Sequence, residues 1–452
     1  MTDLLTNVKE KYLKIYTDNY DILNNDYPNF IAFAREQALT KFKQNGLPTK
    51  KEENYRYTDL NTIFSKNYEL NLKSSLFNIN LEILFKCDVP QLDTHILLTI
   101  NGHFYKNNKL ENLPEGIVIC SLKDASTKYP DIFSKYFNQL AINQNDSIIN
   151  LNTCFFQDGV FIYVKDNTVI EKPLQIVNIA YSLYDLNIFR RNLIIVGENA
   201  HINLLVCDHT LIKSSFLTNV VTEIFLQKNA VMKYTRLQNE NNYSAQLSSL
   251  IIKQETKSNS NINIFSLHGG FVRNNFIVNL DGENSNINLN GLYIGDYNQH
   301  VSNFTLINHN VPHCKSNQLF KSILFNESTS AFNGKIFVSK NAQKTEAYQK
   351  NNNIILTPYA KAYSKPHLEI YADDVKCSHG STTGQLDDDA LFYMRSRGIN
   401  YNEARHLLMF AYGDEIIENI YPEILKSRIQ ELFEKRLRGD LSKCDDCKIH
   451  CA

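Results

Sequence analysis

The strongest constraint on the fold is a short phrase that recurs in the middle of the chain. It begins with an asparagine and carries Ile or Met three residues later, starting at Asn199, Asn229, Asn259 and Asn284, with spacings of 30, 30 and 25 residues. Self-similarity at a period of about 20 to 50 residues indicates a solenoid, a propeller or an array. Because asparagine tolerates the left-handed backbone of a tight corner, the phrase favours a parallel β-helix. A β-sandwich with asparagine-rich turns is the alternative.

Short β-rich runs surround this phrase, among them residues 96–100, 159–164 and 193–196, and each ends in turn residues. A helical-looking insertion, 122 to about 140, interrupts the series. We therefore expect a mainly β core over residues 89–386.

Helical patterns flank the β region. An N-terminal helical domain is expected over residues 1–88, where an apolar stripe ends at Gly46. A C-terminal helical domain with a Cys-rich tail is expected over residues 387–452. There Asp387 and Asn400 can cap helices, Pro422 fits the first turn of a third, and a small bundle is predicted.

Charge and composition exclude several classes of protein. Lys and Arg total 47 against 48 for Asp and Glu, which gives no electrostatic reason to bind nucleic acid or an anionic membrane. The first residues lack the apolar stretch of a signal peptide, and no apolar run approaches the roughly 18 residues of a membrane span. Nine cysteines, most of them far apart, suit a reducing compartment. We expect a cytoplasmic protein.

The most informative stretch for chemistry is residues 365–384, between the β region and the helices. If this stretch is extended, Val375, Cys377 and His379 share one face, because side chains alternate along a strand. A thiol and an imidazole supply half of a tetrahedral metal site, so a metal or cluster here needs ligands from another chain. The structural alternative is a buried Cys and a hydrogen-bonded His that close the end of the β stack.

Other motifs are weaker. Asp373 and Asp374 are adjacent and suit a turn, and the chain has no P-loop with which to hydrolyse a nucleotide. The tail places Cys444, Cys447, His450 and Cys451 within eight residues. This is a possible second metal site, or a reduced and frayed terminus.

Three stretches resemble a known family. They are GKI at 334–336 continuing to AQKTEAYQ at 342–349, KPHLEIYADDVKCSHG at 365–380 and LFYMRSRGI at 391–399. Weaker echoes are KEENYRYT at 51–58 and EKPLQI at 171–176. Together they are similar to the SufB/SufD family of the SUF iron–sulfur cluster assembly system. The resemblance implies a right-handed parallel β-helix between α-helical terminal domains.

Within that family, the chain resembles the SufD type. SufB-type chains carry a cysteine in the strand matching 345–350 and an acidic residue where Gly380 stands, and this chain has neither. The resemblance implies a non-catalytic scaffold that pairs with a SufB-type subunit and a SufC-type ATPase. It also implies that His379 faces the SufB cysteine, with Cys377 as a secondary ligand. A transient Fe–S cluster would then form at the partner interface, with none held stably by the isolated chain, and a homodimer is possible.

Two readings from other classes compete with this one. A carbohydrate-active β-helix enzyme would require acidic or basic catalytic residues in a groove, and commonly a secretion signal. A purely structural β-helix would have no metal role. The three readings differ in whether the chain acts on polysaccharide and whether it forms a complex with SufB and SufC.

Overall fold

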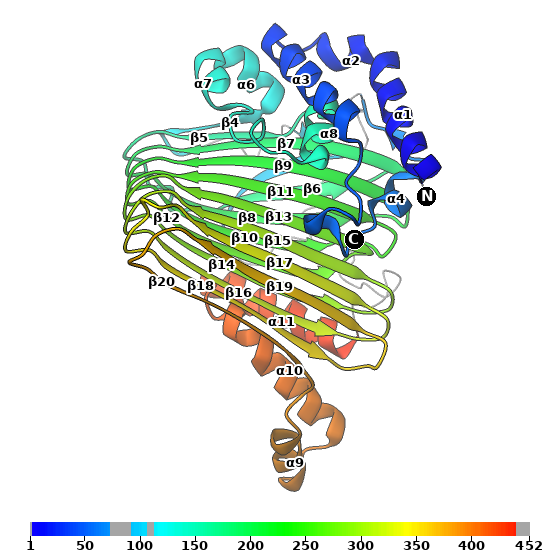
Figure 1. The fold of residues 1–452 in the computed structure, drawn as a ribbon, viewed down its shortest axis with the longest axis vertical. Helices are drawn as coiled ribbons and strands as arrows, with labels where there is room; N and C mark the ends of the chain where they lie inside the picture. The colour runs from blue at the N-terminus through cyan, green and yellow to red at the C-terminus, as the bar shows by residue number, and fades with distance from the viewer. Residues whose placement is uncertain (1, 73–91, 106–112, 440–452) are drawn as a thin grey trace.

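The computed structural model describes residues 2–72, 92–105 and 113–439. The predicted parallel β-helix between helical segments is confirmed (Figure 1). The N-terminal helices are α1 (Thr2–Asp18), α2 (Tyr20–Asn24), α3 (Asn29–Asn45), the 3-10 helix η1 (Glu53–Tyr55) and α4 (Leu60–Phe64). Gly46 ends α3 with a φ of 67°, as its position predicts.

The solenoid consists of two 10-stranded sheets, A and B, and the chain alternates between them. Beyond the first coils the neighbouring strands are parallel, while the pairs β4–β5 and β2–β3 are antiparallel. Sheet A contains β4 (Ile117–Ser121), β5 (Val160–Val164), β7 (Leu186–Val196), β9 (Phe216–Leu226), β11 (Ala245–Gln254), β13 (Phe271–Leu280), β15 (His300–His309), β17 (Thr329–Val338) and β19 (Lys361–Ile370), with β1 (Glu69–Leu70) paired to β7. Sheet B contains β2 (His95–Ile100), β3 (His103–Tyr105), β6 (Leu174–Ala180), β8 (His201–Thr210), β10 (Val231–Asn239), β12 (Asn259–His268), β14 (Asn286–Gly295), β16 (Lys315–Leu324), β18 (Glu346–Ile355) and β20 (Lys376–Gly384).

One corner of the coils explains the asparagine phrase. Stacked residues there adopt a left-handed backbone with φ between 56° and 62°, namely Asn167, Asn199, Asn229, Lys257, Asn284, His313 and Lys344. Nδ2 of Asn229 donates to Oδ1 of Asn199 at 2.7 Å, so the asparagines also bond from coil to coil. The predicted position of the third copy of the phrase, at Asn259, is wrong by two residues. Because Val231 pairs with Asn259, the counterpart of Asn229 is Lys257, and Asn259 instead begins β12.

The helical insertion is longer than predicted. It contains α6 (Leu122–Lys128) and α7 (Pro130–Tyr136), and continues to α8 (Ser147–Phe155), beyond the expected end near residue 140. Every residue of α8 is buried, and the helix packs between α3 and the outer face of sheet A. The N-terminal helices and this insertion share one apolar core with β7 and β9.

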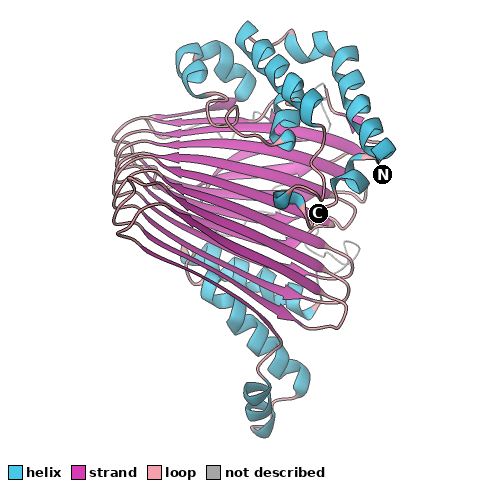
Figure 2. Ribbon diagram, in the orientation of Figure 1, coloured by secondary structure: helices cyan, strands magenta, loops and turns pink. Residues whose placement is uncertain are grey.

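The C-terminal helices are α9 (Asp388–Ser396), α10 (Tyr401–Ile417) and α11 (Glu423–Arg438) (Figure 2). Asp387 and Asn400 cap α9 and α10 as predicted. α10 and α11 contact each other and share a core with the outer face of sheet B. That core includes Leu205, Phe265 and Leu292 of the sheet and Met409, Ile429 and Phe433 of the helices. In the described part of the chain, no helix is both long and apolar enough to cross a membrane.

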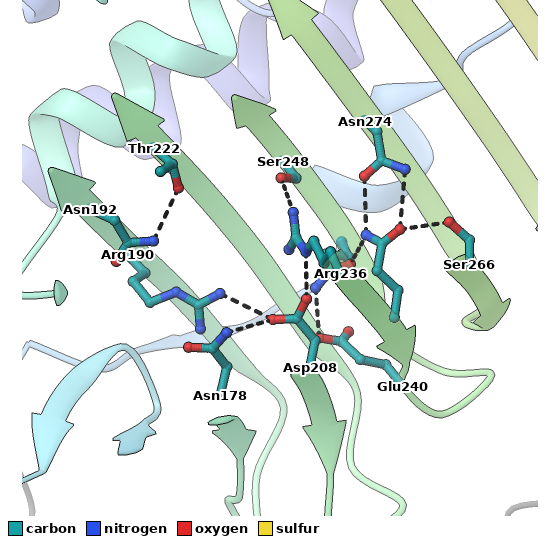
Figure 3. A network of polar contacts seen from close by, with 12 residues as sticks. Asn178, Arg190, Asn192, Asp208, Thr222, Arg236, Glu240, Ser248, Ser266 and Asn274 are labelled. Carbon is teal, nitrogen blue, oxygen red and sulfur yellow. Dashed lines mark hydrogen bonds and ion pairs between the residues drawn. The ribbon is translucent and has the colours of Figure 1, made fainter. Parts of the chain in front are cut away.

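The lumen of the solenoid has an apolar part and a polar part. Figure 3 shows the polar part, where the Asp208 carboxylate lies between Arg190 and Arg236, with N–O distances of 3.1 and 2.7 Å. Burial alone would raise the pKa of Asp208, but the two guanidinium groups lower it to about 2. Burial and the neighbouring Asp208 charge raise the pKa of Glu240 to about 8. This network was not predicted from the sequence.

Candidate functional site at the open end of the solenoid

The last coil, made of β19 and β20, ends the solenoid, and no further strand of the described residues stacks on it. β19 pairs only with β17 and β20 only with β18, so one edge of each strand has no neighbouring strand in the described chain. Most residues of β20 are exposed, whereas the inward residues of β18 are buried. Such an edge presents unpaired N–H and C=O groups to another molecule.

The two predicted ligands lie on this edge strand. Cys377 pairs in register with Ala347, and His379 with Gln349. Ala347 and Gln349 are both buried and face the lumen. Cys377 and His379 therefore share the lumen-facing side of β20, as the alternation predicts. His379 is exposed, whereas Cys377 is partly buried.

Cys377, like Leu368, packs against a small apolar cluster inside the last coils, which includes Ala347. Burial raises the pKa of its thiol, against the effect of a backbone hydrogen bond at Ala347. The neutral thiol is therefore favoured, and a thiolate ligand requires a metal or a cationic partner group. This environment is consistent with Cys377 as a secondary ligand.

Opposite β20, the inner face of β19 carries small and apolar side chains. The Ser381 hydroxyl donates to that of Ser364 at 2.7 Å, so the two inner faces meet at the open end. At the rim, Lys335 pairs with Glu369, and Lys344 pairs with Asp374. Asp373 and Asp374 lie in the bend before β20, as their adjacency predicts.

The metal-binding capacity of this end is limited. Among the described residues, no three or more His, Cys, Asp and Glu side chains are placed so that they could hold a metal ion together. Cys377 and His379 offer two donors, so an iron–sulfur cargo here needs ligands from another molecule. The tail residues Cys444, Cys447, His450 and Cys451 lie outside the described residues.

A second candidate surface is the helix α9, which extends beyond the last coil (Figure 1). None of its residues is buried, and Phe392 is 74% and Tyr393 59% exposed. Arg397 lies over the Tyr393 ring at 5.2 Å from its centroid. An exposed aromatic pair beside cations is typical of a docking surface.

The N-terminal segment reaches the same end along the outside of sheet A. Tyr57 stacks on Tyr363 of β19, with ring centroids 4.1 Å apart. Tyr55 is buried, and its hydroxyl donates to Asp146 at 2.6 Å. Both tyrosines of this segment therefore contact other parts of the same chain.

One residue of this end was missed by sequence reasoning. Gln349 lies buried beneath His379. This placement depends on the pairing of two strands whose residues are about 30 positions apart in the sequence. The signal that could have found Gln349 is a polar residue at a position of β18 where the side chain faces the lumen.

Comparison with known proteins agrees with this architecture. The family model "SUF system FeS cluster assembly, SufBD core domain" matches residues 181–412, and "SufBD protein N-terminal region" matches residues 6–176. The chain is 29% identical to the iron-sulfur cluster assembly protein SufD of Escherichia coli, over 89% of this chain and 92% of that one. It is also 29% identical to an iron-sulfur cluster assembly SufBD family protein of Synechocystis, over 86% and 87%. The chain thus belongs to the SufB/SufD family of the SUF system for FeS cluster assembly.

Proposed function

We propose that this chain is the SufD-type scaffold subunit of a cytoplasmic SUF assembly complex, and that it is not itself an enzyme. Its open solenoid end pairs with a SufB-type subunit, and a transient Fe–S cluster is assembled between them as cargo. The observation that carries the proposal is the uncovered coil with His379 and Cys377 on its lumen-facing side. The full-length similarity to SufD of Escherichia coli supports the choice within the family.

His379 is the principal group that this chain contributes. Its imidazole is exposed at the end of the lumen, where it can bind iron or exchange a proton. Cys377, as a neutral and partly buried thiol, is secondary. In the absence of a SufB-type partner, the same edge can accept a second copy of this chain.

The SufC-type ATPase binds at α9 and the exposed face of α10. The supporting observation is that α9 buries no residue of its own while it exposes Phe392 and Tyr393. An ATPase on this helix would supply the nucleotide hydrolysis that the sequence does not provide.

A proline substitution on the free edge of β20 tests the pairing with the SufB-type subunit. Lys376 donates its N–H to Thr345 of the neighbouring coil, so the N–H of Ser381 points away from β18, because bonding alternates along a parallel strand. Ser381→Pro should abolish capture of the SufB-type subunit by the tagged chain. Ser381→Ala, which removes only the hydroxyl bond to Ser364, is the control and should retain it. Equal capture by both variants would place the partner elsewhere.

A further inference from the structure

A column of polar side chains lies inside the solenoid beneath His379. The strand register pairs Leu289 with Gln318, Gln318 with Gln349, and Gln349 with His379. Deeper coils carry Ile262 and Leu289 at this position. The column therefore changes from apolar to polar two coils before the open end.

The two glutamines of this column are buried without partners. Gln318 and Gln349 are each 1% exposed, and within the described residues neither the nitrogen nor the oxygen of either amide has a hydrogen-bond partner. Burial of an unpaired amide opposes folding, and an apolar side chain of the same size would avoid that penalty. These amides can therefore accept or donate hydrogen bonds to a group that the described residues do not place beside them.

Gly334 makes room for one of these amides. A Cβ atom at Gly334 would lie 2.3 Å from Nε2 of Gln349 and 2.7 Å from its Cδ, so the amide crosses the lumen to sheet A. In the next coil Gly334 pairs with Pro366, which has no N–H to offer. In the coil above, His379 is the register partner of Gln349 and offers a polar side chain on the same lumen-facing column.

We propose that Gln349 is a positioning residue for His379. When a partner covers the open end, one ring N–H of His379 donates to Oε1 of Gln349, and the other ring nitrogen faces the partner. Histidine ligands are generally oriented in this way by a second hydrogen bond. This inference rests on the proposed function of His379 and adds the group that orients it.

The test uses the full chain co-expressed with its SufB-type and SufC-type partners. Gln349→Met removes both unpaired amide atoms and keeps the side-chain volume. The melting temperature should stay the same or rise, while iron and acid-labile sulfide per complex fall roughly tenfold. The double variant with His379→Ala should be no worse than His379→Ala alone, because the two residues act as one unit.

Two further variants sharpen the test. Gln318→Met changes the same kind of amide one coil deeper, so cluster yield should be unchanged. Gln349→Glu keeps an acceptor oxygen and should retain most of the yield. Gln349→Leu, which also lacks both amide atoms, serves in place of Gln349→Met if that variant does not fold.

Each outcome separates the two proposals. A full yield with His379→Ala would refute the proposed role of this end. A loss with His379→Ala but not with Gln349→Met would refute only the positioning role. The positioning role would also be refuted by an equal loss with Gln318→Met, by additive losses in the double variant, or by a Gln349→Glu variant as defective as Gln349→Met.

Discussion

Glu240 allows the energetics of the polar lumen to be tested directly. Its Oε1 accepts a hydrogen bond from Nε2 of Gln246 at 3.1 Å, and its Oε2 has no partner within the described residues. Burial, followed by the charge of Asp208, raises its pKa from the ordinary 4.5 to about 8, against the opposing charges of Arg190 and Arg236. At neutral pH, Glu240 is therefore protonated in the folded chain and ionised in the unfolded chain.

This difference makes stability depend on pH. A raised folded-state pKa gives stability that is complete below pH 4.5 and is lost as the pH rises towards about 8. Each pH unit in that interval costs about 1.4 kcal/mol, so the full interval corresponds to at most about 5 kcal/mol. Glu240→Gln keeps the shape of the protonated side chain without its bound proton. The variant should match the parent near pH 4.5 and exceed its stability increasingly up to pH 8.

Thermal unfolding of the parent and variant at several pH values between 5 and 8 measures this difference. Glu223→Gln is the matched control, because Glu223 is a buried carboxylate paired with Arg191 at 2.7 Å and bonded to three backbone N–H groups. It should lower stability by about 3–5 kcal/mol at neutral pH by leaving Arg191 uncompensated. A melting temperature of Glu240→Gln that is below the parent at pH 8, or a difference independent of pH, would refute the reasoning.

Three other predictions concern the surface and the coils. His379→Ala should lower SUF-dependent growth rescue with little change in the melting temperature of the complex, since the side chain is exposed, and Cys377→Ser should do less; a loss that tracks unfolding would contradict this. Phe392→Ser on α9 should abolish capture of the SufC-type ATPase without lowering the melting temperature, because the side chain is 74% exposed; unchanged capture would move the docking site. Asn199→Val should destabilise the solenoid by about 1–2 kcal/mol in urea unfolding, because Asn199 has a φ of 56° and a β-branched residue is strained there; an unchanged midpoint would contradict this.

The solenoid was predictable because its corners impose a local requirement. Asn199, Asn229 and Asn284 occupy the left-handed corner that asparagine tolerates. The spacing of the phrase along the sequence therefore reflects the number of residues in each coil. Lys257, His313 and Lys344 adopt the same backbone without that signal. At these positions the hydrogen bonds of the adjacent coils impose the corner, and the sequence pattern gives the wrong alignment near Asn259.

The buried elements were harder to predict. α8 is buried on all sides, and its four polar residues also lie inside the protein, so polarity in this segment does not mark a solvent-facing side. β7 and β9 are likewise buried at every position, because helices cover their outer faces. Alternation could not show that Arg190 and Asp208 both face the lumen. The pairing of Gln349 with His379 required the three-dimensional register, whereas Cys377 and His379 were identified from one strand.

If a partner covers the open end, its binding should stabilise the folded chain. A solenoid must cover its last coil, and a helix following β20 could do so, yet α10 and α11 turn back onto the outer face of sheet B (Figure 1). Pro366, Leu368 and Cys377 are left partly exposed, beside two edge strands without further neighbours in the described chain. A partner that covers this coil therefore binds the folded chain and not the unfolded one. Added SufB-type subunit should raise the melting temperature in proportion to the logarithm of its free concentration, and Ser381→Pro should remove that dependence while Ser381→Ala keeps it. A melting temperature independent of the partner concentration would mean that the end coil is not the contact.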